Sequence, residues 1–246
     1  MNQQSVVLVT GGARRVGAAI ARHLHAAGCT LAIHYHRSAA DAEALSAEFN
    51  GVRADSAATF AGALEDDATP EALIGAVLSR FGRLDGLVNN ASAFYPTPIG
   101  QTTPAHWDDL FAANARGPFF LAQAATPALR EARGAIVNIV DIYAERPLGG
   151  HTVYSMAKAA LVMLTQALAK DLAPDVRVNA VAPGPILWPD EEVFDELARQ
   201  RIISHTPLKR EGTPDDIAKA VHYLLADAPY VTGETINVDG GRHIAL

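Results

Sequence analysis

Residues 5–38 read SVVLVTGGARRVGAAIARHLHAAGCTLAIHYHRS, and this stretch sets the fold. Ser5 to Thr10 is a short β-branched apolar run typical of a strand, and Gly11-Gly12 then allow a tight turn. Arg14 to Ala27 follows with helical periodicity, and Thr30 to Tyr35 is a second strand. Strand, helix and strand in this order predict a parallel βαβ unit with a right-handed crossover.

The rest of the chain continues this alternation, without internal repeats or flexible linkers. We therefore predict an α/β fold with a doubly wound parallel (Rossmann) sheet of about seven strands, in a single domain over residues 1–246. Further strands are expected at 59–63, 84–88, 135–140, 176–181 and 235–238, and further helices at 39–49, 70–81, 104–131, 153–171, 191–201 and from 214 onward.

Local signals refine these helices. Thr69 and Thr213 are expected to cap the helices that follow them, and the helix at 104–131 is expected to be interrupted near Asn114 and by Pro118. Residues 185–205 form an irregular region that we expect to cover a pocket.

Charge restricts the partners. The chain has 20 Lys and Arg against 27 Asp and Glu, a net charge of −7, and no run of five basic residues. Neither nucleic acid nor an anionic membrane is an expected partner, so the substrate is expected to be a small molecule.

Several further patterns bear on compartment and metals. The N-terminal MNQQSVVLVTGG has no basic region followed by a long apolar run, and eighteen consecutive apolar residues occur nowhere. Cys29 is the only cysteine, which excludes an internal disulfide and a cysteine-rich metal site. The nine histidines show no HExxH or other metal-ligand spacing. We expect a cytoplasmic protein without a catalytic metal.

The glycine turn TGGARRVG, residues 10–17, indicates a nucleotide site. Glycines let the backbone approach a pyrophosphate, and the free amides at the start of a helix favour an anion. The strict GxGxxG spacing is absent, so a purely structural turn is the alternative. The place of the turn directly after an N-terminal strand favours binding.

The end of the second strand indicates which nucleotide. An NAD enzyme usually presents Asp or Glu to the adenosine ribose about 20 residues beyond the glycines, whereas this chain has His36-Arg37-Ser38. A guanidinium pairs well with a 2′-phosphate, which a carboxylate would repel. The sequence therefore predicts NADP(H).

Tyr154 and Lys158 predict a proton-transfer device. Their spacing of four residues places both side chains on one face of the helix at 153–171. A cation beside a phenol favours the phenolate, so we expect the pKa of Tyr154 to lie below its usual value of about 10. The same spacing is common on solvated helices, so it needs support from its surroundings.

Five motifs supply that support: TGGARRVG at 10–17, NNAS at 89–92, Asn114, YSMAK at 154–158 and VNAVAPG at 178–184. In this order they resemble the short-chain dehydrogenase/reductase family over the whole chain. The resemblance implies that the tyrosine of YSMAK supplies a proton, that its lysine lowers the tyrosine pKa and holds the nicotinamide ribose, and that Asn114 maintains a proton-relay water.

One position departs from most of that family. The serine that usually precedes the tyrosine is replaced by Asp141. This aspartate, Arg15 in the glycine turn, HYHRS at 34–38 and NNASAFYPTP at 89–98 resemble pteridine reductases. The resemblance implies a pterin that stacks between nicotinamide and an aromatic ring at position 94.

The residue arguments and the resemblance together predict the site. The cofactor-binding residues are expected to be Gly11, Arg15, Val16, Gly17, Tyr35, His36, Arg37, Ser38, Leu64, Asn90, Ala91, Ser92, Tyr154, Lys158, Pro183 and Gly184. The expected catalytic residues are Asp141, Tyr154, Lys158 and Asn114, and the expected substrate contacts are Arg15, Ser92, Phe94 and Tyr154.

Three positions are left open. Ala63 stands where the resemblance implies an aspartate at the adenine, and His151 stands where it implies an aromatic residue. Trp188 either lines the pocket or anchors its cover.

The expected function is NADPH-dependent reduction of a dihydropterin, an oxidised pterin or dihydrofolate. One alternative is a carbonyl or 3-oxoacyl reductase of the same family, and another is a non-catalytic NADPH-sensing protein. The resemblance also implies a homotetramer that assembles through the helices at 104–131 and 153–171.

We predict that NADPH is strongly preferred over NADH and that Arg37→Asp inverts this preference, because a carboxylate repels the 2′-phosphate and suits a ribose hydroxyl. The measurement is kcat/KM with each cofactor for both proteins. Equal efficiency of the wild type with the two cofactors would contradict the assignment.

Overall fold

The computed structural model describes residues 5–188 and 195–245. Its centre is a seven-stranded sheet in which all neighbouring strands run parallel, in the order β3-β2-β1-β4-β5-β6-β7. The strands are β1 Val6–Val9, β2 Thr30–Tyr35, β3 Ala57–Ala61, β4 Gly86–Asn89, β5 Ala135–Ile139, β6 Arg177–Pro183 and β7 Thr235–Val238. The order reverses between β1 and β4, which is the switch point of a doubly wound sheet and confirms the predicted fold class.

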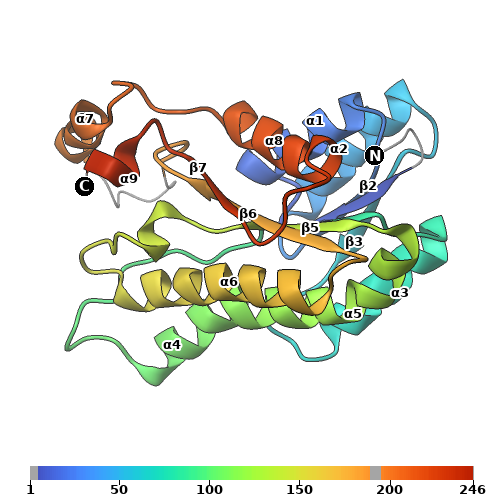
Figure 1. Ribbon diagram of the computed structural model, residues 1–246, viewed down its shortest axis with the longest axis horizontal. Coiled ribbons are helices and arrows are strands. Elements are labelled where there is room, and N and C mark those ends of the chain that lie inside the picture. The colour runs from blue at the N-terminus through green and yellow to red at the C-terminus, as the bar shows by residue number, and fades with distance from the viewer. Residues whose placement is uncertain (1–4, 189–194, 246) are drawn as a thin grey trace.

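Helices cover both faces of this sheet (Figure 1). They are α1 Arg15–Ala26, α2 Ala39–Val52, α3 Thr69–Phe81, α4 Pro104–Phe111, α5 Gly117–Ala132, α6 Thr152–Asp171, α7 Glu196–His205, α8 Pro214–His222 and α9 Arg242–Ala245. Apolar side chains of α1, α2 and α8 form one core cluster with the sheet, and those of α3, α5 and α6 form a second cluster on the other face.

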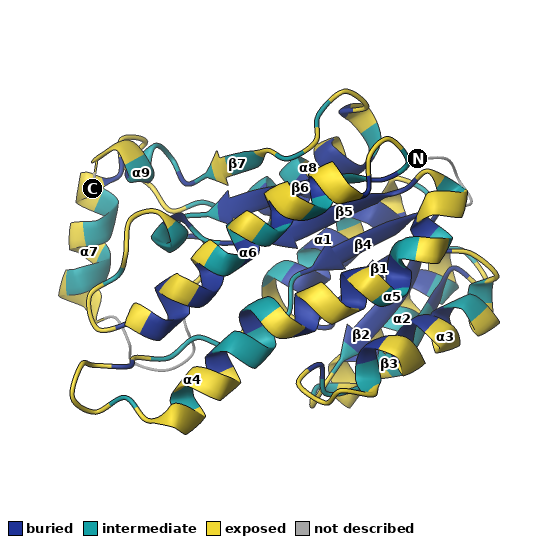
Figure 2. Ribbon diagram, turned by 60° about the horizontal axis from the view of Figure 1, so that its bottom comes forward, coloured by how far each residue is buried: buried dark blue, intermediate teal, exposed yellow. Residues whose placement is uncertain are grey.

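The central strands are almost entirely buried, whereas the helices alternate between buried and exposed residues (Figure 2). Every residue of β1, β4 and β5 is buried. Strands covered on both faces need apolar side chains on both, which is why these strands are continuous apolar runs rather than alternating ones.

Three predicted boundaries are corrected by the structure. Strand β3 runs from Ala57 to Ala61 rather than over 59–63, because its small residues carry little periodicity. Thr69 is the first residue of α3 and makes no capping bond, whereas Thr213 caps α8 as predicted. Helix α7 lies at Glu196–His205, later than the predicted 191–201, of which 191–194 fall outside the described residues.

The long helix predicted at 104–131 is two α-helices joined by a π-helical turn, Ala112–Arg116. The interruption near Asn114 is therefore confirmed. Pro118 does not interrupt a helix. It lies in the first turn of α5, where a missing backbone N–H costs little stability.

A chain of buried polar side chains attaches α6 to the centre of the sheet. Asn89 of β4 donates to Asn138 of β5 at 2.8 Å, and the Asn138 amide donates to the hydroxyl of Thr165 at 2.9 Å. That hydroxyl donates in turn to the carbonyl oxygen of Leu161, one turn earlier in α6. Amide and hydroxyl bonds inside a core are directional, so this chain fixes how far α6 slides along β5.

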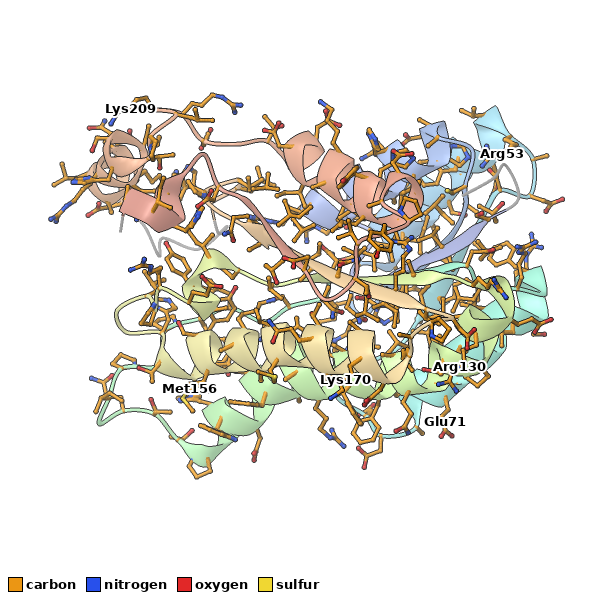
Figure 3. All side chains as sticks on the ribbon, viewed as in Figure 1. Arg53, Glu71, Arg130, Met156, Lys170 and Lys209 are labelled. Carbon is orange, nitrogen blue, oxygen red and sulfur yellow. The ribbon has the colours of Figure 1, made fainter. Side chains whose placement is uncertain are left out.

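Helix α6 is, by length and composition alone, apolar enough to cross a membrane. In the fold it is a core helix. It packs against β6, and Lys158 on its inner face is 2% exposed. Its outer face carries both apolar and charged exposed side chains, of which Met156 and Lys170 are labelled in Figure 3.

We predict that Asn138→Ala lowers the free energy of unfolding by about 2–4 kcal/mol, because it removes the acceptor of the Asn89 amide and the donor to the Thr165 hydroxyl in the core and opens a small cavity. Urea denaturation measures the change. Asn237→Ala, on an exposed position of β7, is the control and should change stability by about 0.5 kcal/mol or less. Equal losses in the two variants would remove the special role of the Asn138 bonds.

Candidate active site

A pocket of about 820 Å³ opens at the carboxyl ends of the central strands. Its walls come from the turn after β1, the end of β2, the segments after β4, β5 and β6, and the first turns of α6. Ligands bind at this edge of doubly wound sheets, beside the switch point.

The structure brings the predicted site residues together. All sixteen predicted cofactor residues line this pocket, and so do Asp141, Phe94 and Trp188. Three of the positions discussed from the sequence do not line it: Asn114 is fully buried behind the wall, His151 is 6% exposed, and Ala63 lies outside the lining.

The turn after β1 is built for close approach of a ligand backbone or phosphate. Gly11 has φ +57°, and a Cβ on Gly17 would collide with the carbonyl oxygen of Gly11. Asn90 closes the turn from β4, because its amide donates to the carbonyl oxygens of Thr10 and Gly11 at 2.9 and 3.1 Å.

The start of α1 fits a dinucleotide pyrophosphate. Its N-cap residue, Arg14, makes no side-chain capping bond, so no side chain of the cap competes with an anion for the first amides of the helix. Arg15 and Arg37 both line the pocket, and Arg37 has no ion-pair partner among the described residues. Guanidinium groups of this kind suit a phosphate-bearing cofactor.

His34 connects the glycine turn to the segment after β3. It begins the HYHRS motif but is not among the predicted site residues. It is 2% exposed, its Nδ1 accepts from the backbone N–H of Gly11 at 3.3 Å, and its Nε2 lies 3.0 Å from the carbonyl oxygen of Gly62. Burial lowers the pKa of His34 to about 4. A neutral imidazole therefore ties the glycine turn to the end of β3.

Asp141 and Tyr154 form the central contact of the pocket. The Tyr154 hydroxyl donates to the Asp141 Oδ2 at 2.7 Å, and the other carboxylate oxygen, Oδ1, accepts from the backbone N–H of Tyr143 at 2.9 Å. Lys158 does not reach the phenol oxygen. Its Nζ donates to the carbonyl oxygen of Ile139 at 3.0 Å and lies 5.7 Å from the centroid of the Tyr154 ring.

Burial decides how these three groups hold their protons. It raises the pKa of Asp141, against the opposing effect of the Tyr154 hydrogen bond, and it lowers the pKa of Lys158 to about 8. Burial and the adjacent Asp141 raise the pKa of Tyr154 well above 10. The prediction that Lys158 would lower the Tyr154 pKa is therefore wrong for this arrangement, because the carboxylate is closer to the phenol than the ammonium is.

Asn114 supports the site from behind. Its Oδ1 accepts from the Ser92 hydroxyl at 2.6 Å, and its Nδ2 donates to the carbonyl oxygens of Leu110 and Ala93 at 2.9 Å each. Asn114 lies in the π-helical turn, and its bonds tie this turn to the wall segment that carries Ser92 and Ala93.

Phe94 forms an aromatic side of the pocket next to the phenol. Its ring is perpendicular to that of Tyr154, at 85° and 4.8 Å between centroids. On another side it stacks on His151 at 14° and 4.8 Å. His151 stands where the resemblance implies an aromatic residue, and it packs against Phe94 outside the pocket lining.

The segment after β6 that carries Trp188 is attached to the glycine turn. Arg15 has φ +51°, and its Nη2 donates to the carbonyl oxygen of Trp188 at 2.7 Å. The guanidinium of Arg199 on α7 lies 5.4 Å from the centroid of the Trp188 ring. Trp188 therefore lines the pocket and is held there by contacts with Arg15 and Arg199.

Several other lining residues were not predicted, and Tyr143 and Ile202 are two of them. Tyr143 follows Asp141 by two residues, and the aromatic ring so close to a candidate acid was an available signal. Ile202 reaches the pocket from α7, and nothing in its local sequence indicates this. Within the described residues, no three His, Cys, Asp or Glu side chains gather at a spacing that would hold a metal ion.

Comparisons with known proteins agree with this geometry. A family model described as enoyl-(acyl carrier protein) reductase matches residues 11–243. Pteridine reductase 1 from Leishmania tarentolae is 40% identical over 96% of this chain and 95% of its own. The 3-oxoacyl-(acyl-carrier-protein) reductase FabG from Staphylococcus aureus (strain Mu50 / ATCC 700699) is 36% identical over 99% and 100%, and the granaticin polyketide synthase putative ketoacyl reductase 2 from Streptomyces violaceoruber is 34% identical over 97% and 96%.

The chain belongs to the short-chain dehydrogenase/reductase family. It is an oxidoreductase of that family, whose members use a nicotinamide cofactor. Among its relatives are both a pteridine reductase and 3-oxoacyl reductases.

We predict that kcat falls as pH rises through the raised pKa of Asp141, because only the neutral carboxyl group below that pKa can donate a hydrogen bond to a substrate while its oxygens still accept from Tyr154 and Tyr143. Asp141→Asn should lower kcat and flatten this part of the profile, since an amide does not titrate. The measurement is kcat against pH with cofactor and substrate saturating.

Asp108→Asn, at an exposed position of α4, is the control for a general loss of negative charge and should leave the profile unchanged. An Asp141→Asn profile that matches the wild type would move the titrating group to Tyr154 or to the substrate.

Proposed function

We propose that the protein reduces a pterin with NADPH, converting a dihydropterin to a tetrahydropterin and also accepting an oxidised pterin or dihydrofolate. The observation that carries this proposal is the contact of Asp141 with Tyr154 at 2.7 Å beside the half-buried ring of Phe94. A flat heteroaromatic ring gains from an aromatic stacking partner, and its polar edge needs fixed donors and acceptors.

The residues have separate tasks in this reaction. Bound NADPH supplies a hydride to carbon, and the proton that the adjacent ring nitrogen requires comes from the Tyr154 hydroxyl. The raised Tyr154 pKa keeps that proton in place until substrate is bound. Asp141 orients the hydroxyl, and Lys158 is placed to hold the nicotinamide ribose. General acid catalysis of this kind typically raises the reaction rate about 10²–10⁴-fold. Fixed geometry between the reacting groups adds to that increase.

Cofactor selection rests on the end of β2. Arg37 and Ser38 line the pocket where a 2′-phosphate of NADP(H) would lie, and no carboxylate occupies β2 or the three residues that follow it. Glu65, which also lines the pocket, lies 3.7 Å from His36 and forms no ion pair with Arg37 among the described residues.

The test is NADPH oxidation by the purified protein with dihydrobiopterin, dihydromonapterin and dihydrofolate, each against a 3-oxoacyl thioester and a simple ketone. Turnover of at least one pterin at a higher kcat/KM than the thioester supports the proposal. Turnover of the thioester or ketone without any pterin contradicts it.

The second candidate function is reduction of a 3-oxoacyl substrate. The FabG relative favours it, since it is 36% identical over its whole length. Asp141 and the Phe94 loop argue against it. A non-catalytic NADPH sensor is the remaining alternative, and NADPH binding without turnover of any of these substrates would support it.

We further propose a cytoplasmic homotetramer of single-domain subunits that binds no nucleic acid or membrane. The outer faces of α4, α5 and α6 expose large apolar side chains that a second copy would cover: Trp107, Phe119, Phe120, Met156 and Met163. Light scattering of the purified protein measures its mass.

We predict that Phe94→Ala weakens pterin turnover and leaves NADPH affinity nearly intact, because an aromatic pair contributes on the order of 1 kcal/mol beyond its buried area. KM for pterin and the dissociation constant for NADPH are the two measurements. Phe94→Leu is the matched control for lost volume and should also weaken pterin binding. An equal loss of cofactor and substrate affinity would reassign Phe94 to the core.

A further inference from the structure

His151 is held in one orientation by the segment around it. The backbone N–H of Thr97 donates to the carbonyl oxygen of Gly150 at 2.6 Å, and the Thr97 hydroxyl accepts from the N–H of Val153 at 3.4 Å. These bonds attach the loop that follows β4 to the start of α6. Residue 151 is the N-cap of α6, so its side chain projects from the junction of the two segments.

The imidazole is buried but does not cap its helix. Its Nδ1 lies 3.0 Å from the carbonyl oxygen of Gly149, an arrangement that requires an N–H at that nitrogen. Its Nε2 is then an acceptor, and it is buried with no hydrogen-bond partner among the described residues. A buried acceptor without a partner costs about 1–3 kcal/mol, so polar bonding does not explain a histidine at this place.

The contact that remains is the stack on Phe94. The two rings are 14° from parallel and 4.8 Å apart, and Phe94 is in turn perpendicular to Tyr154 at the same distance. His151 does not line the pocket, whereas Phe94 and Tyr154 do. The imidazole can therefore act on a substrate only through the ring that it supports.

We propose that His151 is a positioning residue for substrate selection: it fixes the plane of Phe94 relative to the Tyr154 phenol, and so sets the KM for a planar substrate without contacting it. This inference rests on the proposed pterin reduction. The imidazole ring supports Phe94 by stacking, which the hydrogen bond from Nδ1 to the Gly149 carbonyl does not do.

The chain offers a matched control for this stack. His25, in the last turn of α1, is also 6% exposed and stacks on Phe49 at 9° and 4.3 Å. It lies outside the pocket lining and bonds Ser56 at 2.8 Å. Substitution of either histidine removes a ring that stacks on a phenylalanine. Phe94 lines the pocket, whereas Phe49 does not.

The experiment compares His151→Asn, His151→Phe and His25→Asn with the wild type, with KM and kcat for dihydrobiopterin, KM for NADPH and the melting temperature as readouts. Asparagine keeps an N–H donor for the Gly149 carbonyl but has no ring, whereas phenylalanine keeps the ring and has no donor. We expect His151→Asn to raise the KM for dihydrobiopterin about 2- to 10-fold, or ~0.4–1.4 kcal/mol at 1.4 kcal/mol per tenfold, with the KM for NADPH unchanged. We expect His151→Phe to restore the dihydrobiopterin KM to within about 2-fold, a change of ~0.4 kcal/mol on the same scale.

His25→Asn should lower the melting temperature and leave both KM values at the wild-type level. A raised KM in His151→Phe as large as in His151→Asn would overturn the inference, because the hydrogen bond and not the ring would then be the cause. An unchanged KM in His151→Asn, or an equal rise in His25→Asn, would also overturn it. A wild type that does not turn over any pterin would instead contradict the proposed function, and the inference with it.

Discussion

The placement of α6 on β5 is the constraint on which the active site depends. The buried chain from Asn89 through Asn138 to Thr165 fixes the middle of the helix, and Lys158 fixes its first half through the carbonyl oxygen of Ile139. Hydrogen bonds in a water-free core tolerate little displacement, so the helix has one register on the sheet. That register is what carries the Tyr154 hydroxyl to within 2.7 Å of Asp141, a residue from a different element.

The same burial that fixes these groups also determines their protonation. In water an aspartate, a tyrosine and a lysine would be charged, neutral and charged at neutral pH. Here burial disfavours each charged form, so the pKa of Asp141 rises, that of Tyr154 rises, and that of Lys158 falls to about 8. The shifts of Asp141 and Lys158 bring these two groups closer in acid strength, whereas the raised pKa of Tyr154 moves the phenol away from Lys158, so the phenol keeps its proton.

Sequence reasoning reached the fold and the lining of the pocket because both depend on local patterns. Gly11, Asn90 and Asp141 each follow an apolar strand and so mark the carboxyl edge of a parallel sheet. Loops at that edge surround the ligand site of a doubly wound sheet. The boundaries of β3 were missed because small residues give no periodic signal. The Tyr154 pKa was missed for a different reason. The spacing to Lys158 is visible in sequence, whereas the closer approach of Asp141 is a tertiary distance.

Tertiary contacts also explain why Arg15 could not be assigned one role from sequence. Its place in the glycine turn indicated a ligand contact, and in the structure its guanidinium also donates to the carbonyl oxygen of Trp188 in the pocket cover. The glycine turn and the segment at Trp188 are therefore joined by a tertiary contact, through a residue whose backbone is held at φ +51°.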